Sequence, residues 1–260
     1  MRYEVKELSL GEILDQSISL LKNHFQLLAV ILATLMIPVQ IVTSIFATAM
    51  TPSSEDMVAA TDPSVMIGAA VAGVFSGLVV FLVNALTQGA VTWGIAELYL
   101  GRTVTPGECI RTALHRWPAL IATALLAGLG VAVGFMLFIV PGVYLAFAWY
   151  IVYPVLMIEG LPVRKTFGRS RALMKGHMGK AFVVGVVLFV IGFTITMLAE
   201  LVPGSYPSAI LSAVVQSFII GFNCIVVTMI YFSARCLVEN FDLELLAGSV
   251  ARQSIPPKSL

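Results

Sequence analysis

The sequence predicts an all-α integral membrane protein with six transmembrane helices and three cytoplasmic, interfacial, amphipathic helices. Three observations predict it: the apolar composition, several long uncharged stretches, and a one-sided distribution of Lys and Arg. Hydrophobic residues make up 59% of the 260 residues and charged residues only 11%, whereas a soluble domain has about 25% charged residues. Lipid rather than water is therefore the expected solvent.

Five long stretches carry no charged residue, and an apolar helix needs about 20 residues to cross the hydrocarbon core. The stretch Trp117–Ile158 is about twice that length and contains Pro141-Gly142, where we expect a tight outer turn. The alternative for this stretch is a re-entrant loop that never crosses. We predict one polytopic domain, residues 1–260, with spans at about 25–50, 66–98, 118–140, 142–159, 180–201 and 207–237.

With six crossings, all 15 Lys and Arg residues fall on one side of the membrane. The opposite side then holds only acids, namely Glu55, Asp56, Asp62 and Glu200. Because loops rich in Lys and Arg stay in the cytoplasm, both termini are expected there. The expected location is a bacterial inner (plasma) membrane, crossed several times.

A short segment of mixed polarity precedes the first, third and fifth spans. Ser9 and Glu12, and Thr105 and Glu108, have the spacing of a capping box, which starts a helix. Apolar residues recur at helical spacing in the first segment, as in a helix lying at a membrane surface. These interfacial helices are expected at about 9–23, 105–116 and 162–177. A short helix plus a two-span hairpin, used three times, predicts a threefold parallel repeat.

The third interfacial segment is the most basic part of the chain, and basic residues near an anionic leaflet attract lipid headgroups. The candidate headgroup ligands are Arg164, Lys165, Arg169, Arg171 and Lys175. The alternative is that these charges only enforce orientation. Membrane lipids, with anionic lipids as one option, are the expected partners, and no nucleic acid is expected. A homo-oligomer or a partner membrane protein stays open.

A second set of charges should lie at one cytoplasmic depth. It consists of Glu159, Arg169, Arg235 and Glu239. We expect a salt-bridge cluster that ties the third interfacial helix to the end of the last span, with a ligand site as the alternative.

Uncharged polar residues also occur within the spans. Asn84 and Gln88 are four residues apart and Gln216 and Asn223 are seven apart, so each pair lies on one helix face. Interhelical hydrogen bonding is the first explanation. The alternative is a polar substrate path, because burying such groups in a membrane is costly.

No motif for a catalytic triad, a P-loop or a paired-cysteine metal site occurs, so we expect no enzyme activity, no cofactor and no metal. The three histidines, His24, His115 and His177, each stand just before a span. We interpret them as interfacial anchors, with a metal site as the alternative.

Several segments resemble the membrane domain of glycerophosphodiester phosphodiesterases and related uncharacterised bacterial integral membrane proteins. They are Leu8–Asp15, Ile139–Tyr144, Pro154–Gly160, Thr166–Gly176 and Tyr231–Glu244. The resemblance runs over most of the chain and implies a six-helix type of membrane protein. Family members often have Asp where this chain has Ser233. Their phosphodiesterase activity resides in a separate soluble barrel, which needs about 200 or more residues, so that activity is not implied here.

We therefore predict a non-enzymatic integral inner-membrane protein that interacts with lipid or acts as a scaffold in the cell envelope. The alternative is a transporter or channel for a small polar or amphipathic solute.

Overall fold

A computed structural model describes residues 8–50, 63–199 and 201–239. The regular elements in these ranges are all helical, which confirms the predicted all-α fold. They are α1 (Leu10–Asn23), α2 (Phe25–Met50), α3 (Pro63–Tyr99), α4 (Pro106–His115), α5 (Trp117–Leu137), α6 (Ile139–Ala148), α7 (Val152–Pro154), a π-helical turn (Val155–Glu159), α8 (Val163–Met174), α9 (Met178–Ala199) and α10 (Ser205–Glu239). The predicted outer acids Glu55, Asp56, Asp62 and Glu200, and both chain ends, lie outside the described residues.

Six helical segments are long and apolar enough to cross a membrane, which confirms the predicted number by length and composition. They are Phe25–Phe46, Ala70–Tyr99, Trp117–Leu137, Ile139–Glu159, Met178–Ala199 and Tyr206–Glu239. The chain is therefore a multi-pass membrane protein.

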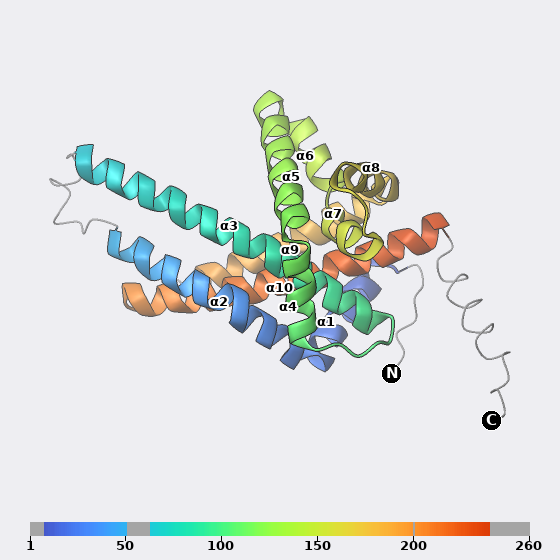
Figure 1. Cartoon of the computed structure of the whole chain (residues 1–260), viewed down its shortest axis with the longest axis horizontal. Helices are drawn as coiled ribbons and strands as arrows, with labels where there is room; N and C mark the ends of the chain where they lie inside the picture. Colours follow the sequence, from blue (N-terminus) through green and yellow to red (C-terminus); the bar gives the residue numbers. More distant parts are fainter. Residues whose placement is uncertain (1–7, 51–62, 200, 240–260) are drawn as a thin grey trace.

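Helix α10 is the element around which the others pack. It contacts α1, α2, α3 and α9, and Figure 1 shows α2, α3 and α10 extended along the long axis of the molecule. The helix is buried near its C-terminal end at Tyr231 and Phe232. The Phe232 ring lies 4.9 Å from that of Tyr99 on α3. The Leu8 N–H donates to the Ser233 hydroxyl at 3.0 Å. These contacts hold α1 and α3 against one end of α10.

The hairpin of α5 and α6 turns at Phe138, which is extended (φ −163°, ψ 155°). The predicted turn at Pro141-Gly142 is wrong by a few residues, because both residues lie in the first turn of α6. Proline is tolerated there, since the N–H groups of a first helical turn have no partner within the helix. The two helices approach closely: a Cβ on Gly134 would lie 2.9 Å from the Gly142 Cα.

The fourth predicted span is broken inside, a feature that the sequence analysis did not anticipate. Helix α6 ends at Ala148, and regular helix resumes only at Val152. Pro154 explains the break, because it has no N–H to donate to the carbonyl four residues earlier and its ring clashes with that carbonyl. Within the break the Val152 N–H donates to the Trp149 carbonyl at 3.1 Å, and the Ala148 carbonyl accepts a hydrogen bond from the Ser170 hydroxyl of α8 at 3.0 Å. The break therefore helps to dock α8.

The α5–α6 hairpin projects away from the rest, across the direction of α3 and α10 (Figure 1). Its tip is apolar and strongly exposed, with Met136 at 89% and Val140 at 79% exposure. At the base of the hairpin, the Arg116 guanidinium donates to the Leu156 carbonyl at 3.0 Å. The hairpin is thus anchored at its base and free of protein contact along much of its outer surface.

Short helices occur at the three places where interfacial helices are predicted. Both expected capping boxes form: Ser9 with Glu12 and Thr105 with Glu108 each exchange two hydrogen bonds. Helix α8 begins after Pro162 without a side-chain cap. Each short helix precedes one hairpin in the order of elements. The threefold repeat and the position of these helices at a membrane surface stay predictions.

We predict that Gly134→Ala lowers the free energy of unfolding by about 1–3 kcal/mol, the usual effect of overpacking, because the new Cβ meets backbone atoms of Gly142. Gly128→Ala is the matched control on α5, since a Cβ there meets nothing within 4 Å. The measurement is thermal unfolding in detergent micelles. Equal unfolding temperatures for the two variants would contradict the close packing of the hairpin.

Candidate functional site

The basic residues of α8 separate into two groups. Arg164, Lys165, Arg171 and Lys175 are exposed, whereas Arg169 is turned towards neighbouring acids. No ion pair of Arg164, Lys165, Arg171 or Lys175 occurs within residues 8–50, 63–199 and 201–239. Of the five predicted headgroup ligands, four thus remain available and Arg169 is engaged elsewhere.

Arg171 and Lys175 line a cavity of about 600 Å³ between α6, α8 and the start of α9. The Arg171 Nε donates to the Tyr144 hydroxyl at 3.0 Å, and its guanidinium carbon lies 5.6 Å from the centre of the same ring. Gly168, Gly176 and other small or apolar residues complete the wall, and none of the lining residues is acidic. The tyrosine holds Arg171 in place but leaves its charge uncompensated.

The predicted cytoplasmic cluster comes together as a network. The Arg169 Nε donates to both carboxylate oxygens of Glu159, at 2.9 and 3.1 Å, and its Nη2 pairs with Glu239. The Arg235 Nε also donates to Glu239, at 3.0 Å. The Tyr231 hydroxyl donates to Glu159 at 3.1 Å. The cluster therefore joins the base of the α5–α6 hairpin, α8 and the end of α10.

Hydrogen bonds to carboxylates favour the charged form of Arg169. Partial burial lowers the pKa of Arg169, but its hydrogen bonds to Glu159 and Glu239 outweigh that effect and raise the pKa above its ordinary value. The side chains of Glu159 and Arg169 are only 13% and 26% exposed, so the pair is partly shielded from water. Each charged side chain in the cluster has an oppositely charged partner, so few donors or acceptors remain for an added ligand.

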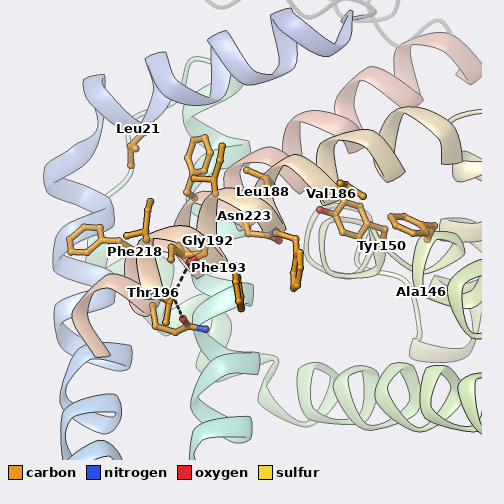
Figure 2. Close-up of a pocket in the computed structure, with 18 residues that line it drawn as sticks. Leu21, Ala146, Tyr150, Val186, Leu188, Gly192, Phe193, Thr196, Phe218 and Asn223 are labelled. Atoms are coloured by element: carbon orange, nitrogen blue, oxygen red, sulfur yellow. Dashed lines mark hydrogen bonds between the residues drawn. The ribbon is translucent and has the colours of Figure 1, made fainter. Parts of the chain in front are cut away.

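The four intramembrane polar residues all line cavities. The Gln88 amide donates to the Asn84 side chain within α3, and both residues line a cavity of about 330 Å³. The Thr196 hydroxyl lies 3.5 Å from the Gln216 Oε1. Gln216 and Asn223 line a groove of about 890 Å³ between α6, α9 and α10, drawn in Figure 2. Among the described residues, no hydrogen bond joins the pair on α3 to the pair on α10.

Sequence reasoning missed two tyrosines that connect these spaces. Tyr153 lines the cavity at Asn84 and also a cavity of about 360 Å³ that contains Gln88. Tyr150 and Asn223 line that second cavity and the large groove as well. The spacing of Tyr150 and Tyr153 beside the helix-breaking Pro154 was the available signal.

The described residues contain no group of three or more His, Cys, Asp or Glu side chains that could hold a metal ion. His24, His115 and His177 therefore do not assemble into the alternative metal site. Cys109, Cys224 and Cys236 are buried and form no disulfide with one another.

Comparison of the chain with protein-family models, curated proteins and solved structures gives no match.

We predict that Arg169→Gln destabilises the protein by about 1–3 kcal/mol, because it removes the guanidinium that two partly buried carboxylates share. Arg164→Gln, on the same helix, removes an exposed charge without a protein partner and should change stability by less than about 0.5 kcal/mol. Thermal unfolding in detergent measures both. Indistinguishable variants would mean that the cluster does not support the fold.

Proposed function

We propose that this chain is a lipid-interacting membrane protein that binds the headgroup of an anionic lipid in the cavity between α6, α8 and α9. The carrying observation is the convergence of Arg171 and Lys175 on a cavity lined by no acidic residue. Such a cavity has the charge and the size for a phosphate-bearing headgroup. The absence of a recognisable catalytic motif in the sequence supports a non-enzymatic role.

Each basic residue would have a distinct part in headgroup binding. A guanidinium presents a planar set of donors that matches two phosphate oxygens, whereas an ammonium acts as a point charge. The contact with Tyr144 orients Arg171 before any lipid binds, which lowers the entropy lost on binding. Basic residues near an anionic leaflet each contribute about 1 kcal/mol, so Arg164 and Lys165 would add general attraction.

The contact between Arg171 and Tyr144 also limits how deeply the α5–α6 hairpin can lie in the membrane. Tyr144 lies five residues after Ile139, where α6 begins, a distance of about 8 Å along a helix. A guanidinium avoids the hydrocarbon, which is about 30 Å thick. While Arg171 stays among the headgroups, the tip of the hairpin cannot reach the opposite surface. The contact therefore favours the re-entrant alternative, with the tip inside the cytoplasmic leaflet.

A scaffold role is compatible with this proposal. The cluster around Arg169 fixes the hairpin to α8 and α10, so the exposed apolar arm is held in one direction. An arm of that kind, lying within a leaflet, would present a surface to lipid chains or to a neighbouring membrane protein.

We predict that the protein binds phosphatidylglycerol more tightly than phosphatidylcholine and that Arg171→Gln with Lys175→Gln weakens this preference about tenfold or more, since two charged contacts are lost. Native mass spectrometry of the full chain measures the bound lipid. Arg164→Gln with Lys165→Gln is the charge-matched control and should weaken it less. Equal effects of the two double variants would reduce the site to non-specific attraction. Competition by inorganic phosphate alone would identify a soluble anion as the ligand.

The hairpin proposal predicts that Ile139→Cys does not react with a membrane-impermeant maleimide added from the outside. Leu201→Cys, in the turn between α9 and α10, is the control that should react, since Ile139 and Leu201 are similarly exposed in the structure at 74% and 75%. Labelling of cells with a permeabilised outer membrane measures both. Reaction of Ile139→Cys at the rate of Leu201→Cys would show that the hairpin crosses.

A further inference from the structure

The groove between α6, α9 and α10 differs in chemistry from the cavity at Arg171 and Lys175. None of its lining residues is Asp, Glu, Lys, Arg or His. Most of its wall is aliphatic or aromatic, and the aromatic side chains include Phe147, Phe189, Phe193, Phe218 and Phe222. Its volume of about 890 Å³ is within the range of pockets that hold a small molecule, about 300–1,000 Å³. The groove suits hydrocarbon chains.

Four uncharged polar side chains interrupt this apolar wall. The Thr196 hydroxyl lies 3.5 Å from the Gln216 Oε1, and the other two side chains are Tyr150 and Asn223. Figure 2 shows both side chains at the groove, from α6–α7 and α10 respectively. The Asn223 amide lies close to the Tyr150 hydroxyl, but they do not meet in a hydrogen bond of normal geometry, and this buried hydroxyl has no other partner within the described part of the chain. Buried polar groups are rarely left so, and a ligand with an oxygen would satisfy the hydroxyl.

The position of this pair strengthens the case for a ligand. Tyr150 and Asn223 also line the cavity of about 360 Å³ on their other side, together with Gln88 and Thr92. The pair thus forms a polar partition between two spaces among membrane-spanning segments. A molecule held there must have chains compatible with the groove and a polar part that is uncharged, because no charged group lines the groove to compensate an ion.

We propose that the groove binds an uncharged membrane lipid of the diacylglycerol type. Its acyl chains would lie along α9 and α10, and its hydroxyl and ester oxygens would meet Tyr150 and Asn223. The tyrosine hydroxyl and the amide N–H groups donate, and the amide oxygen accepts, which matches a ligand with two ester carbonyls and one hydroxyl. A phospholipid has compatible chains but brings a charged phosphate to a site without a counter-charge. This site does not depend on the headgroup cavity proposed above.

The test is photo-crosslinking of the full chain in nanodiscs with a diacylglycerol that carries a diazirine in one acyl chain. Val186→Trp places a large ring in the groove, and Val183→Trp is the control, because Val183 is similarly exposed on α9 but does not line the groove. We expect Val186→Trp to lower labelling about fivefold and Val183→Trp to leave it unchanged. Thermal unfolding of both variants controls for folding.

Tyr150→Phe removes the hydroxyl and keeps the ring. We expect it to weaken competition by unlabelled diacylglycerol about fivefold, the effect of one net hydrogen bond. Phosphatidylglycerol with the same chains should compete at least about fivefold less well than diacylglycerol. Arg171→Gln with Lys175→Gln should leave the labelling unchanged.

Three results would overturn the proposal. Equal labelling of Val186→Trp and Val183→Trp would place the probe elsewhere. Equal competition by the two lipids, or no effect of Tyr150→Phe, would show that the groove holds ordinary lipid chains without selecting a polar part. Loss of labelling in the Arg171 and Lys175 variant would mean that there is no separate site.

Discussion

The cost of placing a charge in hydrocarbon constrains every other feature of this molecule. It divides the chain into apolar segments and short polar helices, and it disfavours the charges of α8 in the hydrocarbon. The hydrogen bond from Arg171 to Tyr144 extends that constraint to α6. A helix pair that is apolar on all sides is thereby tied, through one tyrosine, to the charged helix α8.

The cluster of Glu159, Arg169, Arg235 and Glu239 makes this arrangement rigid. Two acids and two bases from three parts of the chain neutralise one another at the point where the hairpin base, α8 and α10 meet. Arg169 is engaged in that network, which leaves Arg171 and Lys175, two and six residues further along the chain, to face the cavity. A single short helix thus supports the fold with one basic residue and leaves others exposed at a cavity.

The sequence predicted the parts of this structure that depend on local chemistry or on depth. The capping boxes at Ser9 and Thr105 form because each needs only residues within one helical turn. The charge cluster could be anticipated because Glu159, Arg235 and Glu239 stand near the ends of recognisable apolar stretches and Arg169 lies in the basic segment that follows Glu159.

Features that depend on packing between apolar helices could not be predicted in the same way. Helix α5 is apolar on every side, so its sequence does not say which face meets protein and which meets lipid. The direction of the α5–α6 hairpin and the pairing of Tyr150 with Asn223 both follow from that packing. The turn at Phe138 was misplaced because Pro141-Gly142 is typical of a turn but is equally suited to a first helical turn.

The most direct test of the central claim is a solid-state NMR measurement of dephasing between the guanidinium nitrogens of labelled arginine and lipid phosphorus, in bilayers that contain phosphatidylglycerol. The account predicts a close nitrogen–phosphorus contact that disappears in Arg171→Lys and persists in Arg164→Lys. Dephasing that is unchanged by Arg171→Lys, or that is absent in the unmodified chain, would contradict a headgroup site at Arg171.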